Sequence, residues 1–130
     1  MSKYNFIVVD DSALDCFIAE KMIMHTGICE SVKSFTQAGE ALDYIRANSL
    51  EAATLPTVVI LDVLMPMMSG FAFVEAFEEL SEEVKERYTI VALTSSMNKT
   101  DMEKILSYQV VKKLLDKPIT SETIITLLER

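Results

Sequence analysis

The 130-residue sequence is short of several residue types, and each shortage argues against a class of site. Only two cysteines are present, Cys16 and Cys29, and their spacing matches no metal-binding pattern. We therefore expect reduced thiols in a cytoplasmic protein rather than disulfides. The single histidine, His25, has no catalytic partner near it in the sequence, and we interpret it as a surface side chain.

Long apolar runs are also missing, although 50% of the residues are hydrophobic. No run approaches the roughly 20 residues that a membrane-spanning helix needs, so no membrane contact is expected. Met1 to Asn5 lead directly into a strand pattern, so no signal peptide is expected. Positive charge is scarce, because 12 Lys and Arg face 20 Asp and Glu, for a net charge of -8. Since phosphate contacts need clusters of Lys and Arg, direct binding of nucleic acid is not expected.

The chain does contain a regular alternation of strand and helix patterns, without repeats, low-complexity segments or linkers. Short β-branched and apolar runs predict strands at Asn5–Val9, Ser31–Phe35, Thr57–Leu61, Tyr88–Leu93 and Lys112–Leu115. Strands that alternate with helices imply right-handed crossovers and a parallel sheet covered on both faces. We therefore predict a single domain, residues 1–130, with a doubly wound five-stranded α/β fold.

The helical segments lie between these strands and carry recognisable ends. Polar residues suited to capping a helix N-terminus are Ser12, Thr36, Asn98 and Thr120, and Gly27 is a natural stop. Ser81–Arg87 is a charged stretch that we predict to be a solvated turn or loop. Apolar stripes at helical spacing are Leu14, Phe17, Ile18 and Met22; Ala41, Leu42 and Ile45; Phe73, Val74 and Phe77; Met102, Ile105 and Leu106; and Ile124, Leu127 and Leu128.

Polar residues follow four of the predicted strands. They are Asp10 and Asp11 after the first, Asp62 after the third, Thr94 after the fourth and Lys117 after the fifth. The carboxyl ends of parallel strands meet at one edge of the sheet, so we expect these side chains in one cleft. Crowded carboxylates repel unless a cation sits among them, and oxygen ligands with room for water suit Mg²⁺. A metal and an ammonium flanking Asp62 suit a phosphoryl group bonded to that carboxylate, with the Thr94 hydroxyl on another phosphoryl oxygen.

This pattern resembles the receiver domain of two-component response regulators over nearly the whole chain. The matching motifs are Asp10-Asp11, Asp62 followed by Met-Pro-x-Met-x-Gly (Met65 to Gly70), Thr94 and Lys117-Pro118. The resemblance implies a flavodoxin-like sheet with strand order 2-1-3-4-5. It also implies a phosphoacceptor signalling domain rather than an enzyme. Its phosphodonor would be the phosphohistidine of a sensor histidine kinase or histidine phosphotransfer protein.

The resemblance further implies a role for each site residue. Asp62 accepts the phosphoryl group and, with Asp11 and the backbone carbonyl of Leu64, binds Mg²⁺ directly, while Asp10 acts partly through water. Thr94 and Lys117 contact the phosphoryl oxygens and switch partner contacts through the helix after Thr94, the fifth strand and the last helix. The Lys117–Pro118 peptide bond is expected to be cis. The output is a downstream protein target or an effector domain beyond residue 130, and a homodimer is left open.

Some positions depart from the family pattern. Leu114 stands where the family often carries a Tyr or Phe switch, three residues before its lysine, and Tyr108 is either an aromatic substitute or a solvated tyrosine at a helix end. Leu64 and Ser96 occupy the positions expected to orient an attacking water. The Leu64 side chain can neither donate a hydrogen bond to water nor accept one from it. We therefore expect slow hydrolysis of the phosphoryl group on Asp62.

Two other classes share parts of the pattern. A haloacid dehalogenase-type phosphatase or phosphotransferase also uses a strand-end Asp, Mg²⁺ and Lys, but it needs a second acid where this chain has Leu64. A flavodoxin-like flavin protein needs a Ser/Thr/Gly-rich loop after the first strand, whereas Asp10-Asp11-Ser12 would repel phosphate. The alternative function is a receiver-like docking module that is not phosphorylated. Such a module would normally have lost one of the acids or the lysine.

Overall fold

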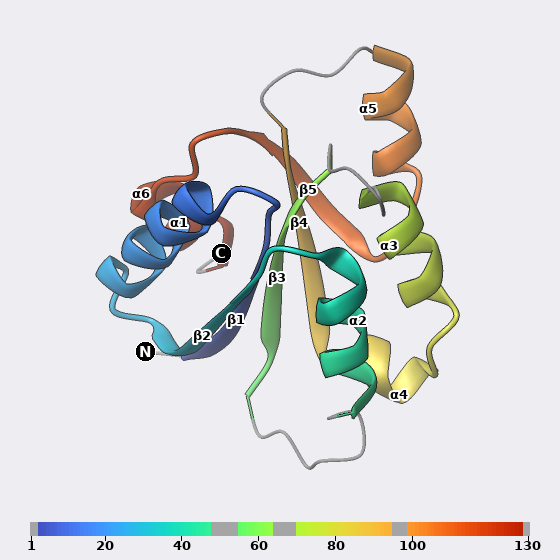
Figure 1. Ribbon diagram of the computed structural model, residues 1–130, viewed down its shortest axis with the longest axis horizontal. Coiled ribbons are helices and arrows are strands. Elements are labelled where there is room, and N and C mark those ends of the chain that lie inside the picture. The colour runs from blue at the N-terminus through green and yellow to red at the C-terminus, as the bar shows by residue number, and fades with distance from the viewer. Residues whose placement is uncertain (1–2, 48–54, 64–69, 95–98, 129–130) are drawn as a thin grey trace.

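The structure is a computed structural model that describes residues 3–47, 55–63, 70–94 and 99–128. Within these ranges the chain forms a parallel sheet with strand order β2-β1-β3-β4-β5 and helices on both faces (Figure 1). The doubly wound fold and the strand order predicted from the sequence are therefore confirmed, with Ser31–Phe35 on an edge strand as expected.

The strands and helices alternate along the chain. The strands are β1 (Tyr4–Val9), β2 (Cys29–Phe35), β3 (Thr57–Asp62), β4 (Tyr88–Thr94) and β5 (Val111–Asp116). The helices are α1 (Ala13–His25), α2 (Ala38–Ala47), α3 (Gly70–Glu78), α4 (Glu82–Lys85), α5 (Lys99–Leu106) and α6 (Ser121–Leu128). No helix in the described ranges is both long and apolar enough to cross a membrane.

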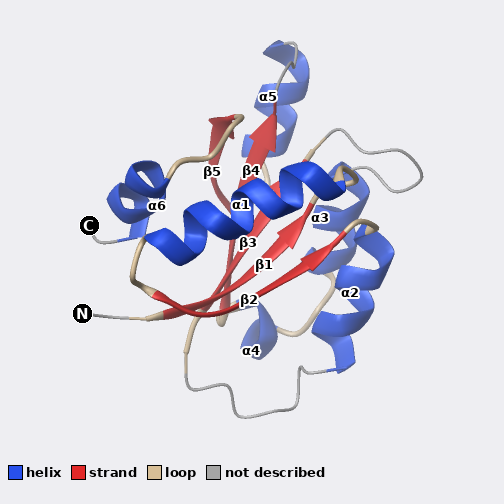
Figure 2. Cartoon of the chain, turned by 60° about the vertical axis from the view of Figure 1, so that its left-hand side comes forward, coloured by secondary structure: helices blue, strands red, loops and turns tan. Residues whose placement is uncertain are grey.

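Two apolar layers hold the helices to the sheet. Helices α1 and α6 cover one face, and α2, α3 and α5 cover the other (Figures 1 and 2). Successive strand side chains point to opposite faces, so Phe6 and Val8 of β1 enter one layer and Ile7 and Val9 the other. Strand β3 lies in the middle of the sheet and all its residues are buried, which explains its continuous apolar run.

The apolar stripe predicted for α1 is only partly correct, because Ile18 and Met22 are half-buried but the other two residues are exposed. The helix buries Cys16, Ala19 and Ile23 against the sheet, whereas Leu14 is 66% exposed and Phe17 is 55% exposed. Much of the circumference of α1 is apolar, so spacing alone offers two candidate faces. Packing favours the face with the small residues, because Ala and Cys let the helix axis lie close to the strands.

The stripe predicted for α5 is only partly correct. Ile105 is fully buried, but Met102 and Leu106 are exposed. This helix packs beside β5, which is one of the two edge strands of the sheet. An edge strand offers a narrow surface, so one row of side chains is covered and the flanking row faces outward. The stripes predicted for α2, α3 and α6 are buried or half-buried as expected.

Several predicted helix ends are confirmed by hydrogen bonds. The Ser12 hydroxyl accepts from the Asp15 N–H at 3.1 Å, and the Thr120 hydroxyl accepts from the Thr123 N–H at 3.2 Å. Gly27 follows α1 with a φ of 78°, a conformation that favours glycine. The charged stretch Ser81–Arg87, predicted to be a solvated turn or loop, forms the single-turn helix α4 with Val84 buried. Asn98 lies outside the described residues.

Candidate functional site

The predicted polar residues meet at the carboxyl edge of the sheet. Asp10 follows β1, Asp62 ends β3 and Thr94 ends β4, and all three residues are buried, Asp62 to 5% exposure. The strand register aligns these ends, because Asp62 pairs with Leu93 across β3 and β4. Regular pairing of buried strands therefore brings together polar groups that lie far apart in the sequence.

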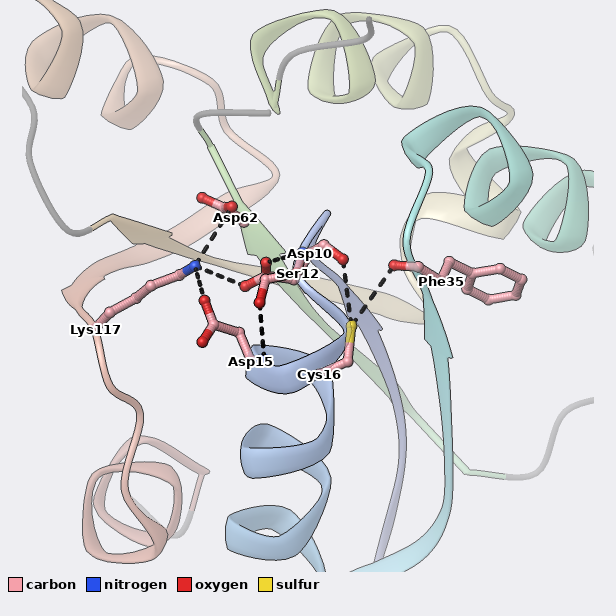
Figure 3. Close-up of polar contacts among 7 residues, drawn as sticks. All are labelled: Asp10, Ser12, Asp15, Cys16, Phe35, Asp62 and Lys117. Atoms are coloured by element: carbon pink, nitrogen blue, oxygen red, sulfur yellow. Dashed lines mark hydrogen bonds and ion pairs between the residues drawn. The ribbon is translucent and has the colours of Figure 1, made fainter. Parts of the chain in front are cut away.

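Lys117 reaches this edge from the segment after β5. Its ammonium lies 2.7 Å from Asp10 Oδ2, 3.1 Å from Asp15 Oδ2 and 3.4 Å from Asp62 Oδ2 (Figure 3). Its backbone N–H donates to the carbonyl oxygen of Thr94 at 2.9 Å, which ties the segment to the end of β4. The Lys117–Pro118 peptide bond is cis, as predicted.

The surrounding carboxylates keep Lys117 protonated. Burial of the ammonium lowers its pKa, but hydrogen bonds to Asp10 and Asp15 and attraction by Asp10 and Asp62 act in the opposite direction. The balance places the pKa of Lys117 above the ordinary lysine value. The site therefore contains a permanent positive charge beside Asp62.

Three acids at this edge fit a divalent cation. Asp10, Asp11 and Asp62 each offer a carboxylate oxygen within 4.8 Å of the others, with Asp11 on the exposed side. The backbone N–H of Ser12 donates to Asp10 Oδ1 at 2.9 Å and orients that carboxylate. Mg²⁺ requires hard oxygen donors with an open side for water. The single positive charge of Lys117 does not balance the negative charge of the three acids. The donor set therefore fits Mg²⁺. Leu64, whose carbonyl was expected to be a further ligand, lies outside the described residues.

Asp15 is a site residue that sequence reasoning missed. Its place in the first turn of a helix after Ser12 indicates only that its negative charge is favourable at a helix N-terminus. In the structure its carboxylate points to Lys117 (Figure 3). The available signal was its position, because the first turn of α1 directly follows the strand end at Asp10 and so lies at the same edge of the sheet.

Cys16 packs directly beneath the site. Its thiol donates to the carbonyl oxygen of Asp10 at 3.3 Å, and Cys29 is likewise a free thiol. Burial, with the charges of Asp10 and Glu20, raises the pKa of Cys16 to about 11. The thiol is therefore an inert packing group, in agreement with the reduced, structural cysteine expected from the sequence.

The region expected to carry the switch has an aromatic contact of its own. Leu114 is half-buried and packs against the apolar layer under α2, α3 and α5. Tyr108, between α5 and β5, packs against the same layer, and its hydroxyl donates to Glu75 Oε2 of α3 at 2.5 Å. Tyr108 is thus half-buried and bonded to α3, while its hydroxyl stays at the surface. Ser96 lies outside the described residues.

Comparisons with known proteins agree with this geometry. The sequence profile of the response regulator receiver domain matches residues 6–129. No curated protein sequence matches the chain. A response regulator receiver protein from Dyadobacter fermentans is similar in structure, with 33% identity and a TM-score of 0.85, over 98% of this chain and 96% of that one.

Two further solved structures share the fold. The chemotaxis protein CheY4 from Vibrio cholerae has 26% identity and a TM-score of 0.77, over 99% of this chain and 98% of that one. A two-component response regulator from Cytophaga hutchinsonii has 21% identity and a TM-score of 0.87, over 99% of this chain and 96% of that one. Receiver domains are signalling domains of two-component systems. Because the family profile covers nearly the whole chain and a 33% identical receiver protein has the same fold over 98% of it, this protein belongs to the response regulator receiver domain family.

Proposed function

We propose that this protein is a phosphoacceptor of a two-component pathway and that Asp62 is the residue that is phosphorylated. The observation that carries the proposal is the surroundings of Asp62. Its carboxylate lies at the end of the central strand, 3.4 Å from the Lys117 ammonium and within 4.8 Å of oxygens from Asp10 and Asp11. Positive charge on one side and a cation-binding set on the other are what a phosphorylated carboxylate needs.

Mg²⁺ would be held by Asp10, Asp11 and Asp62. When bound, it supplies positive charge that offsets the charge of the carboxylates and of the phosphoryl oxygens. The comparison with receiver domains supports this assignment, and so does the donor set, which consists of carboxylate oxygens alone in the described residues.

The chain's own residues would carry out the transfer. A carboxylate oxygen of Asp62 attacks the phosphorus of a phosphohistidine, the new O–P bond forms and the N–P bond to the donor histidine breaks. Lys117 and the Thr94 hydroxyl donate to the phosphoryl oxygens, where negative charge is concentrated. Burial of Asp62 limits access by water and makes each of these contacts stronger than it would be in solution.

The proposed partners follow from this chemistry. The phosphodonor is a sensor histidine kinase or a histidine phosphotransfer protein in the cytoplasm. The response passes to a downstream protein through the face formed by α5, β5 and α6, because Thr94 and Lys117 lie at the ends of the two strands that lead into these helices. The hydrogen bond from Lys117 N–H to the Thr94 carbonyl links those two strand ends directly.

The test uses a small phosphodonor and a matched variant. Wild-type protein incubated with Mg²⁺ and acetyl phosphate should gain one phosphoryl group by intact mass, and Asp62→Asn should gain none. Asp43→Asn is the control, because it removes the same charge from an exposed position on α2. Equal incorporation in wild type and Asp62→Asn would exclude Asp62 as the acceptor. No incorporation from acetyl phosphate or from phosphohistidine donors would favour the docking module.

A further inference from the structure

Asp15 adds a carboxylate to the site from outside the set that fits Mg²⁺. It stands in the first turn of α1, where the Ser12 hydroxyl accepts from its backbone N–H at 3.1 Å. Its Oδ2 accepts from the Lys117 ammonium at 3.1 Å, shorter than the 3.4 Å from that ammonium to Asp62 (Figure 3). In this structure the ammonium is therefore drawn more toward α1 than toward the acceptor.

A lysine ammonium has three N–H donors, and carboxylates already surround this one. Asp10, Asp15 and Asp62 all lie within 3.4 Å of it. A phosphoryl group on Asp62 brings strongly accepting oxygens with a charge of about -1.5 to -2. The ammonium already faces Asp62 at 3.4 Å, so drawing it onto the phosphoryl oxygens weakens its contacts on the other side, to Asp10 and Asp15.

Asp15 is the partner best placed to be released. Asp10 is buried and is held by the Ser12 N–H at 2.9 Å, so losing Lys117 would leave a charge inside the protein. The Asp15 side chain is 41% exposed, so water can solvate its carboxylate once the lysine leaves. Release of Asp15 is therefore the less costly change.

The pair is not tightly packed against α1. A cavity of about 60 Å³ borders both Asp15 and Lys117 and is lined further by Pro118 and Ile119. Unfilled space next to the lysine means that its side chain can change direction without displacing packed neighbours.

We propose that Asp15 is a positioning residue that holds Lys117 against α1 while Asp62 is unphosphorylated and competes with the phosphoryl group for that ammonium. The inference rests on the proposed function of Asp62. A contact present in only one of two states stabilises that state, so Asp15 lowers the affinity of the site for a phosphoryl group. Asp15 thereby sets how favourable phosphoryl transfer from the donor must be before Asp62 becomes phosphorylated.

The first test measures binding of beryllofluoride, which mimics a phosphoryl group on a carboxylate, by calorimetry at fixed Mg²⁺. Asp15→Asn should bind it about two- to fivefold tighter than wild type, the range expected for loss of a partly exposed ion pair. Asp43→Asn makes the same change in charge at a side chain that is 80% exposed, and it should bind beryllofluoride like wild type. Equal or weaker binding by Asp15→Asn would overturn the proposal.

A double-mutant cycle separates competition for the lysine from simple charge repulsion. In a Lys117→Gln background the gain from Asp15→Asn should disappear, because the ammonium for which Asp15 competes is gone. If the same gain persists, Asp15 acts through space on the bound anion, and its role as a positioning residue is excluded.

A second measurement does not depend on how well Lys117→Gln folds. The ¹⁵N resonance of the Lys117 ammonium, assigned with Lys117→Arg, is recorded without Mg²⁺ or beryllofluoride. In Asp15→Asn it should shift from the wild-type position toward the position that wild type adopts with beryllofluoride. An unchanged resonance would overturn the proposal.

The same experiments distinguish a failure of the proposed function of Asp62 from a failure of the proposed role of Asp15. If wild type and Asp43→Asn bind no beryllofluoride, the proposed function fails and the role of Asp15 fails with it. If both bind it and Asp15→Asn is indistinguishable from them, only the role of Asp15 is excluded.

Discussion

Gly70 lies directly against the backbone of Val63. Its N–H donates to the Val63 carbonyl oxygen at 2.9 Å, and a Cβ at position 70 would stand 2.6 Å from the Val63 Cα. Atoms that are not bonded to each other do not approach so closely. Only glycine therefore lets α3 begin beside the end of β3, where Asp62 stands.

This contact predicts that Gly70→Ala destabilises the protein. Backbone must move to admit the methyl group, and overpacking of this kind costs about 1–3 kcal/mol. Urea unfolding should show a lower midpoint. The control is Gly39→Ala in α2, where a Cβ would meet nothing within 4 Å. There alanine should raise the free energy of unfolding by as much as about 1 kcal/mol, because it favours the helix more than glycine does. Similar midpoints for the two variants would contradict the close packing at Gly70.

The packing of α1 predicts which of its apolar residues support the fold. Ile23 is fully buried, so Ile23→Ala should lower the free energy of unfolding by about 2–5 kcal/mol. Phe17 is 55% exposed, and Phe17→Ala should cost well under half of that, because most of the ring already faces solvent. Denaturant unfolding of both variants measures the difference. A larger loss for Phe17→Ala would mean that the helix packs by the face predicted from sequence spacing.

The acidic cluster predicts the effect of removing Asp11. Asp11→Ala should weaken Mg²⁺ binding by at least about tenfold, since even changes around the direct ligands of a metal cost that much. Calorimetric titration with Mg²⁺ tests this, with Asp43→Ala as the control for lost surface charge. Equal affinity in wild type and Asp11→Ala would exclude Asp11 as a ligand.

The contact between Tyr108 and Glu75 predicts a shift in an alkaline titration. The hydrogen bond to Glu75, together with burial and the charges of Glu75 and Glu78, raises the pKa of Tyr108 to about 12. The neutral phenol donates to Glu75 whereas the phenolate is repelled. The contact therefore stabilises the fold below the ordinary tyrosine pKa near 10, and this support is lost as pH rises toward about 12.

Absorbance of tyrosinate follows this titration directly. In Glu75→Gln, Tyr108 should ionise at a lower pH than in wild type, and Tyr108→Phe identifies its step among the other tyrosines. A titration curve unchanged by Glu75→Gln would mean that the two side chains are not bonded in solution.

Much of the fold and site was predictable from local sequence. The buried run Thr57–Leu61 reads as a strand covered on both faces, and such strands occur in parallel sheets whose carboxyl ends share one edge. That rule alone predicts that Asp10, Asp62 and Lys117 meet, and the structure brings them together. The strand order and the cis bond before Pro118 required the family resemblance as well, because neither follows from periodicity.

Tertiary structure alone decided the face of α1 and the partners of Lys117. Leu14 and Ile23 are both apolar, and which one is buried depends on how closely the helix can approach the sheet. Similarly, Asp15 and Asp62 offer the same chemical group, and the sequence contains no distance from either to the lysine. Side-chain spacing along one element is a local property, so the sequence determines it. Contacts between elements depend on packing against partners distant in sequence, so they appear only once the chain is folded.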